Sequence, residues 1–419
     1  MAATRLPSRS SARLRIAIVP ALNRRTAIIF CTILLVAMGY GIFIPVVPFF
    51  AKSMGASGRD LGFLTAAYAA MQFLFAPVWG DLSDRIGRRP VILIGVMGCI
   101  VSQVLYGLST QLWMFYASRA LSGALTSAVF PTAMAYIADA TAPEERSGGM
   151  GLVSAGMYTG MMFGPALGGL LANISLTLPF FVAAALSTLV LAFVFFMLPE
   201  SLPAEQRKPG GRRSVGANLT QMAPALRGPL GRFFLLTFLF SFGMSHHWSI
   251  FGLYVMQRFS YTPDQVGAVM AAAGVGSALV QAFLTGRVAR WWGEAAVVRG
   301  ALLASAIGFL VILLAATFPT VTLAACFYVM ASSLLSPMVA ALISRAAGQG
   351  QGAAMGLNSS FMSLGQIIGP IWAGYALDLS YKLPFLSGAT VMAVGWAITI
   401  AWGRAAGRGQ RAHAAKTLS

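Results

Sequence analysis

The sequence predicts an all-α membrane protein with twelve transmembrane helices in two six-helix halves, and three observations lead to this fold class. Of the 419 residues, 58% are hydrophobic and only 10% are charged, whereas about 25% are charged in ordinary soluble proteins. Twelve apolar runs approach or exceed the length of about 20 residues that a membrane-spanning helix needs. A pattern of glycines followed by proline occurs twice, half the chain length apart. Lipid is therefore the solvent that fits this composition.

The apolar runs divide the chain into two similar halves. The expected spans are residues 27–50, 61–80, 91–108, 112–137, 148–172, 178–198, 230–256, 265–285, 296–316, 320–343, 352–377 and 384–403. Between Pro199 and Pro229 the composition becomes polar and basic, which predicts a flexible, partly helical linker in the cytoplasm. We expect an N-terminal half at 1–200, the linker at 201–229 and a C-terminal half at 230–419.

The distribution of charge predicts how the helices are oriented. The formal net charge is +18, from 29 Lys and Arg against 11 Asp and Glu. If odd-numbered connections face outward, 24 of the 29 basic residues lie in cytoplasmic segments, Arg119 lies within a span, and four lie outside (Lys52, Arg59, Arg258 and Lys382). Basic residues concentrate on the cytoplasmic side of membrane proteins, so we expect a plasma-membrane protein with both termini in the cytoplasm. The same bias explains the charge without nucleic acid as a partner.

The first glycine pattern predicts close packing between two helices. Glycines at every fourth residue form a ridge without side chains on one face of a helix, and in lipid such a ridge lets a second helix approach closely. A proline within the pattern removes a backbone donor and bends the helix. The motif consists of Gly156, Gly160, Gly164, Pro165, Gly168 and Gly169. A second copy runs from Gly365 to Gly374 and includes Gly369-Pro370.

The connection after the second span is rich in opposite charges. Its notable residues are Gly80, Asp81, Asp84, Arg85, Gly87, Arg88 and Arg89. Glycines at both ends permit a tight turn, and the arginines suit a cytoplasmic loop. Because acids contribute little to membrane orientation, the two aspartates indicate a latch that holds one conformation. A solvated basic turn is the alternative interpretation.

Together these motifs resemble the major facilitator superfamily. The charged loop is similar to the family signature between helices two and three, and Arg119-Ala-Leu-Ser-Gly123 resembles a second signature in helix four. The glycine ridge resembles the helix-five signature of the proton-coupled antiporters. Within the family the chain resembles drug–proton antiporters of the tetracycline-exporter type, although Val36 stands where those exporters have an aspartate. The resemblance implies two parallel repeats, and it implies drug export better than it implies tetracycline as the substrate.

The resemblance also implies roles for individual charged residues. Asp84 and Arg85 would lock one gating state, with Asp139 as their ionic partner or, alternatively, as a simple helix-end charge. Arg119 would lie in the central region and assist proton coupling, since an arginine within a membrane helix is costly without a partner or water.

Two histidines extend the set of candidate proton carriers. His246 and His247 lie in the middle of the seventh span, where no carboxylate occurs. Histidine titrates in a range that suits a proton switch, so at least one of the pair ranks after Asp84 or Asp139 as a proton carrier. The alternative is that neighbouring helices satisfy both rings structurally.

A substrate cavity is implied by residues on helices that line the central cavity in this family. These polar, aromatic or flexible candidates are Tyr40, Gln72, Tyr158, Met161, Trp248, Gln281, Asn358, Gln366 and Trp372. Methionine is flexible and polarisable, so such a surface can adapt to varied flat apolar molecules. Hydrogen bonding or packing between helices is the alternative for each residue.

The leading hypothesis is a secondary active exporter of lipophilic drugs in exchange for protons, working as a monomer in the lipid bilayer. The first alternative is export of an amphipathic metabolite, siderophore or lipid by the same fold. The second is an uncoupled facilitative carrier or a transporter-like sensor. We expect no enzyme, cofactor or metal site, because no catalytic constellation, nucleotide-binding loop or metal-ligand spacing occurs.

Overall fold

The computed structural model describes residues 24–142, 145–207 and 215–417. The basic N-terminal segment and the basic centre of the expected linker lie outside these residues. The helices are α1 (Arg24–Ser53), α2 (Gly58–Ile86), α3 (Arg88–Leu108), α4 (Leu112–Thr126), α5 (Val129–Ala140), α6 (Arg146–Ala172), α7 (Leu178–Met197), α8 (Val215–Arg227), α9 (Gly231–Phe259), α10 (Pro263–Leu279), α11 (Thr285–Trp292), α12 (Glu294–Leu314), α13 (Phe318–Ser333), α14 (Leu335–Ala347), α15 (Gln351–Leu379) and α16 (Leu383–Thr417). Two short 3₁₀ turns, Ala204–Gln206 and Gly348–Gly350, and one π-helical turn, Val280–Leu284, complete them.

Each expected span coincides with one helix or with one broken helix. The broken spans are α4–α5, α10–α11 and α13–α14. Pro131 and Pro337 lie in the first turns of α5 and α14, and a proline ring clashes with the carbonyl four residues earlier, so a regular helix cannot continue through these positions. In α10–α11 the regular helix is interrupted by the π-helical turn.

Length and hydropathy agree with a membrane protein. Within the described residues, nine helices qualify as membrane spans, or ten when the bent pair Thr220–Arg227 and Gly231–Phe259 counts as one span. The expected spans not counted in this way are α6 and α15, which have 27 and 29 residues. Helices of this length rise about 40 Å, and their glycines lower the mean hydropathy. The predicted all-α membrane fold is therefore confirmed, with the glycine-rich spans recognised by their length.

The predicted glycine ridge packs α6 against α1. A Cβ on Gly164 would lie 2.6 Å from the Cα of Gly41, and one on Gly156 would lie 3.0 Å from the carbonyl oxygen of Phe30. The second copy packs α15 against α9 in the same way, because a Cβ on Gly365 would lie 2.7 Å from the backbone nitrogen of Phe242. Both ridges therefore bring helix backbones into direct contact, as predicted.

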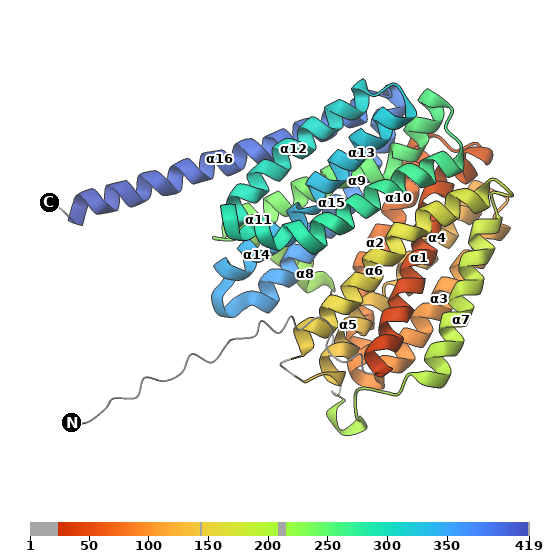
Figure 1. Ribbon diagram of the computed structural model, residues 1–419. Helices are drawn as coiled ribbons and strands as arrows, with labels where there is room; N and C mark the ends of the chain where they lie inside the picture. Colours follow the sequence, from red (N-terminus) through yellow and green to blue (C-terminus); the bar gives the residue numbers. More distant parts are fainter. Residues whose placement is uncertain (1–23, 143–144, 208–214, 418–419) are drawn as a thin grey trace, which may run out of the picture.

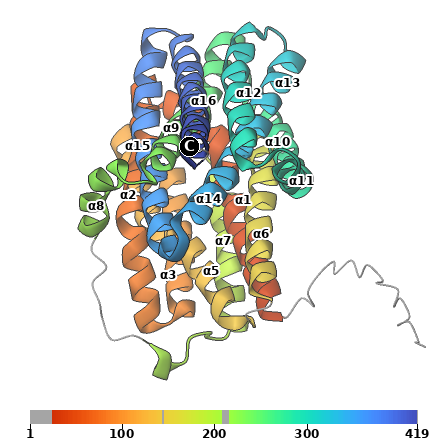
Figure 2. The same cartoon turned by 90° about the vertical axis from the view of Figure 1, so that its left-hand side faces the viewer.

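Two seams join the bundle of α1–α7 to the bundle of α9–α16, and they pair α2 with α15 and α6 with α10 (Figure 2). A Cβ on Gly62 would overlap the carbonyl oxygen of Pro370, and a Cβ on Gly267 would overlap that of Pro165. Both the two glycines and the two prolines are 205 residues apart, so the seams are equivalent by the internal repeat. They lie toward the α1–α2 turn, at what we call the closed end.

The same helices separate at the opposite end of the bundle, which carries the α2–α3 turn and which we call the open end (Figure 1). Among the described residues, no neighbouring atom lies within 4 Å of a Cβ placed on Gly80, Gly151, Gly286 or Gly356. Gly80, Gly151 and Gly356 lie in the seam helices α2, α6 and α15, and Gly286 lies in α11, which continues the seam helix α10. The two halves are therefore in contact at one end and apart at the other.

Candidate substrate cavity and gates

A central cavity of about 640 Å³ lies between the two halves. Its walls include side chains of α1, α2, α4 and α6 from the first half and of α9, α10 and α15 from the second. This volume is within the range of pockets that hold drug-sized molecules. The predicted residues that line it are Tyr40, Gln72, Tyr158, Met161, Trp248, Gln281 and Gln366.

Two predicted cavity residues lie elsewhere, and their placement corrects the prediction. Asn358 is buried within the second half, where its side-chain oxygen accepts a 2.6 Å hydrogen bond from the hydroxyl of Thr237. Trp372 is 48% exposed, and its indole N–H donates to the hydroxyl of Ser387 on α16 at 3.0 Å. Both residues belong to helix–helix contacts within the second half.

Arg119 lines the cavity, and aromatic rings hold its side chain. Its guanidinium carbon lies 4.4 Å from the ring centre of Phe43, 4.5 Å from that of Tyr68 and 6.0 Å from that of Tyr40. The Nε group donates to the carbonyl oxygen of Leu64 at 3.3 Å. Aromatic faces attract cations, so the rings stabilise a charge that has no ion-pair partner within the described part of the chain.

The two histidines do not line the cavity. Their side chains are buried, with exposed fractions of 1% for His246 and 2% for His247. The Nδ1 atom of His246 lies 2.7 Å from the carbonyl oxygen of Phe242, one turn earlier on α9. The ring of His247 packs between Phe251 and Tyr328, with centroids 4.6 and 4.8 Å away. Both rings are thus packed away from the cavity, but neighbouring helices do not satisfy them fully, because Nε2 of His246 and Nδ1 of His247 are buried without a hydrogen-bond partner among the described residues.

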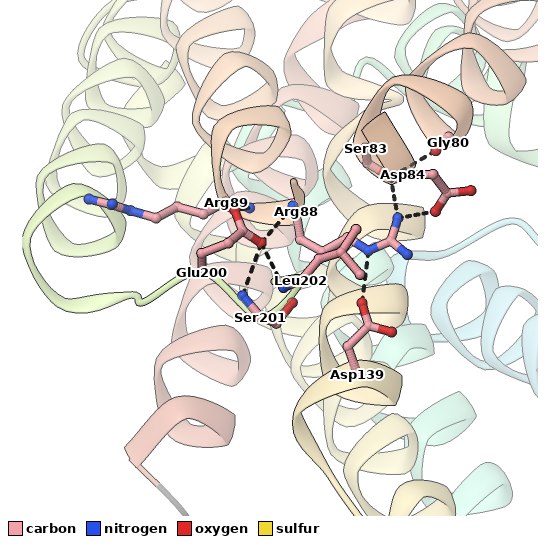
Figure 3. Close-up of polar contacts among 9 residues, drawn as sticks. All are labelled: Gly80, Ser83, Asp84, Arg88, Arg89, Asp139, Glu200, Ser201 and Leu202. Atoms are coloured by element: carbon pink, nitrogen blue, oxygen red, sulfur yellow. Dashed lines mark hydrogen bonds and ion pairs between the residues drawn. The ribbon is translucent and has the colours of Figure 1, made fainter. Parts of the chain in front are cut away.

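The charged turn at the open end forms a network centred on Arg88 (Figure 3). Its guanidinium donates to Asp84 at 2.5 Å, to Asp139 at 2.9 Å and to the hydroxyl of Ser83 at 2.7 Å. These three partners come from α2 and α5, so one arginine at the start of α3 connects three helices of the first half. The network braces that half internally.

This network corrects the expected pairing of Asp84 with Arg85 and of both with Asp139. Arg85 pairs instead with Asp81 at 2.5 Å, four residues earlier on α2, and Asp139 pairs with Arg88. Consecutive helical residues point about 100° apart, whereas residues four apart lie on one face. The latch predicted within the 84–85 pair is therefore not formed in this conformation.

Glu200, which sequence reasoning missed, caps the N-terminus of α3. Its carboxylate accepts the backbone N–H groups of Arg88 at 2.8 Å and Arg89 at 3.1 Å, and also those of Ser201 and Leu202 (Figure 3). A negative charge at this position satisfies otherwise unpaired amides and suits the positive end of the helix dipole. The segment after α7 is thereby fixed to the charged turn.

The second half carries an equivalent brace with its charges reversed. Glu294 begins α12 and pairs with Arg345 of α14 at 2.6 Å. By the internal repeat, Glu294 corresponds to Arg88 and Arg345 to Asp139, each at an offset of 206. In each half, therefore, an ion pair within that half holds the turn at the open end. Within the described residues, the ion pairs at this end stay inside one half.

An ion pair that sequence reasoning missed crosses from one half to the other at the closed end. The carboxylate of Asp378 on α15 accepts the backbone N–H of Gly58 at 2.7 Å, that of Arg59 at 3.0 Å and the Nε of Arg59 at 3.1 Å. It thus caps the N-terminus of α2 from the opposite half. These contacts join the first turn of α2 to the last turn of α15 across the boundary between the halves.

A cavity lined by two repeated halves, sealed at one end and open at the other, defines a membrane transporter that exposes its cavity to one side at a time. Residues 29–230 and 233–417 match the sequence profile of the Major Facilitator Superfamily. The chain belongs to this superfamily, which confirms the resemblance of its motifs.

Several known proteins are similar to the chain. It is 34% identical over 376 residues to Multidrug resistance protein 2 of Bacillus subtilis (strain 168), covering 90% of this chain and 94% of that protein. It is 28% identical over 380 residues to Quinolone resistance protein NorA of Staphylococcus aureus (strain COL), covering 90% and 96%. Among solved structures, the human organic anion transporter MFSD10 matches with a TM-score of 0.68 at 25% identity, covering 91% of this chain and 100% of that one. A mutant of the nucleoside transporter NupG matches with a TM-score of 0.79 at 12% identity, covering 90% and 99%.

Proposed function

We propose that the protein exports lipophilic drugs from the cytoplasm in exchange for protons. The observation that carries this proposal is the central cavity, whose aromatic, methionine and polar walls suit flat amphipathic molecules. Relatives described as multidrug and quinolone resistance proteins support the same function. The packed glycine ridge of α6, which resembles the antiporter signature, supports exchange rather than simple diffusion.

The orientation follows from the charges. Basic residues gather at the open end and in the linker, so this end faces the cytoplasm of a plasma-membrane protein with both termini inside. In this conformation the substrate then enters the cavity from the cytoplasm. It is released outward after the closed end opens. The proposed working unit is the monomer, because the cavity is lined by two halves of one chain.

The proposed domain division follows the helices. The first half is residues 1–200, the linker is 201–229, and the second half is 230–419. The linker contains the turn Ala204–Gln206 and helix α8, which bends by 116° into α9. Asp84 and Asp139 are the candidate proton carriers, because both carboxylates contact an arginine whose release frees them to accept protons.

Proteoliposomes test the function directly. The purified protein is reconstituted with a pH-sensitive dye inside, and a neutral lipophilic probe, N-phenyl-1-naphthylamine, is added with and without an imposed proton gradient. We expect probe-dependent proton movement and gradient-dependent accumulation of the probe. Probe movement that is unaffected by the gradient would identify an uncoupled carrier, and absence of probe movement would exclude export of neutral lipophilic molecules. The variant Gly164→Leu, which obstructs the contact between α6 and α1, serves as the inactive control.

A further inference from the structure

The cavity contains a positive charge without a balancing carboxylate. Arg119 lines it, whereas none of the described acidic residues does. We propose that the preferred substrates are amphipathic organic anions, bound through their acidic group at Arg119, and that lipophilic cations are disfavoured. This inference rests on the proposed export function and adds the charge of the molecule that is exported.

The setting of Arg119 suits an acidic ligand. Only 5% of the residue is exposed, so its charge acts in surroundings of low dielectric constant, where attraction to an anion is stronger than in water. Its Nε group is engaged with Leu64. The terminal nitrogens of a guanidinium form a planar pair of donors that matches the two oxygens of a carboxylate, sulfonate or phosphate. The aromatic rings fix the orientation of this donor pair.

The same rings explain why a cation is disfavoured. A lipophilic cation in a neutral cavity is held by aromatic faces, but here Tyr68 and Phe43 already contact the guanidinium of Arg119 at 4.5 and 4.4 Å. A cationic ligand would meet an unbalanced like charge instead. Val36 also lines the cavity as a neutral side chain, so no acid compensates from α1.

The remaining walls accommodate the apolar body of such an anion. Met161 and Met162 of the first half and Phe240, Met244 and Trp248 of the second line the cavity. Flexible thioethers and flat rings adapt to apolar surfaces of different shape. The acidic group is therefore recognised by one half, and the apolar part is shared between both halves.

Two dyes with the same xanthene framework and opposite charge test the inference. Binding of fluorescein, an anion, and of rhodamine 123, a cation, is measured by fluorescence polarisation with the full-length protein in nanodiscs. We expect fluorescein to bind at least tenfold more tightly. Arg119→Gln should weaken fluorescein binding about ten- to hundredfold, the range of a hydrogen bond to a charged group, without weakening rhodamine 123. Arg119→Lys should lie between, because it keeps the charge and loses the planar donor pair.

A gain-of-function variant keeps the test decisive if Arg119→Gln does not fold. Val36→Asp adds a carboxylate to the cavity and should strengthen rhodamine 123 binding, whereas the matched neutral control Val36→Asn should not. Equal or tighter binding of rhodamine 123 by the unmodified protein would overturn the inference, and so would absence of fluorescein binding. Neither result bears on export itself, which is measured separately with the neutral probe in proteoliposomes.

Discussion

Removing the carboxylate at the closed end should shift the protein toward conformations that are open at that end. Asp378 caps α2 across the boundary between the halves, through the backbone N–H groups of Gly58 and Arg59. These contacts exist only while the closed end is closed. The substitution Asp378→Ala therefore destabilises one state of the transport cycle and leaves the other unchanged.

The magnitude follows from the contacts that are lost. The Arg59 side chain is 52% exposed, so solvent screening leaves its ion pair a minor contribution. The main loss is an acidic helix cap, which contributes about 1 kcal/mol. Since every 1.4 kcal/mol changes a population ratio about tenfold, the ratio of outward-open to inward-open protein should rise about fivefold.

Distance measurements by pulsed electron paramagnetic resonance can detect this shift. One spin label is placed on the α1–α2 turn and one on the α15–α16 turn, on a cysteine-free background. The matched control is Asp60→Ala, which removes an acidic cap from the same turn of α2. The partners of Asp60, namely Ser57 and Tyr116, belong to its own half, so the control should leave the distance distribution unchanged. The reasoning is refuted if both variants shift the distribution equally or if neither does.

Three further predictions concern the ridge, the brace and the histidines. Gly164→Leu should abolish export and lower the melting temperature, with a smaller effect of Gly164→Ala, because even a Cβ would lie 2.6 Å from Gly41; an active leucine variant would contradict the packing. Arg88→Gln should lower the melting temperature of the purified protein by leaving Asp84 and Asp139 unpaired, and an unchanged melting temperature would show that the brace is dispensable. His247→Phe should retain proton-driven export in vesicles, since the ring packs among aromatic residues away from the cavity; loss of pH dependence would restore this histidine as a proton carrier.

Features that depend on local periodicity could be predicted from the sequence. The spans and the glycine ridge follow from composition and from four-residue spacing, and both agree with the structure. Placement on a helix face was harder to predict. At about 100° per residue, Trp372 points about 120° away from Gln366 on the same helix, so only Gln366 lines the cavity. A residue's helix alone therefore did not identify its surroundings.

Contacts between distant segments could not be predicted in this way. The partners of Arg88 and Asp378 lie on other helices, and no local pattern selects among the available acids. The internal repeat does carry part of the missing information. Glu294 and Arg345 stand at the repeat positions of Arg88 and Asp139 with reversed charge. An alignment of the two halves therefore indicates that both pairs form equivalent contacts.

The π-helical turn Val280–Leu284 lies where the second half is one residue longer than the first. Before it, equivalent glycines are 205 residues apart (Gly62 and Gly267), and after it they are 206 apart (Gly80 and Gly286). One additional amino acid in a regular helix would rotate everything that follows by about 100°. A turn closed by i→i+5 bonds takes up one residue more than an α-turn, so α11 keeps the phase of its counterpart in α2. The additional residue is thus accommodated beside the cavity, where Gln281 of the widened turn belongs to the lining, while the helix beyond the turn keeps the orientation of its counterpart in the first half.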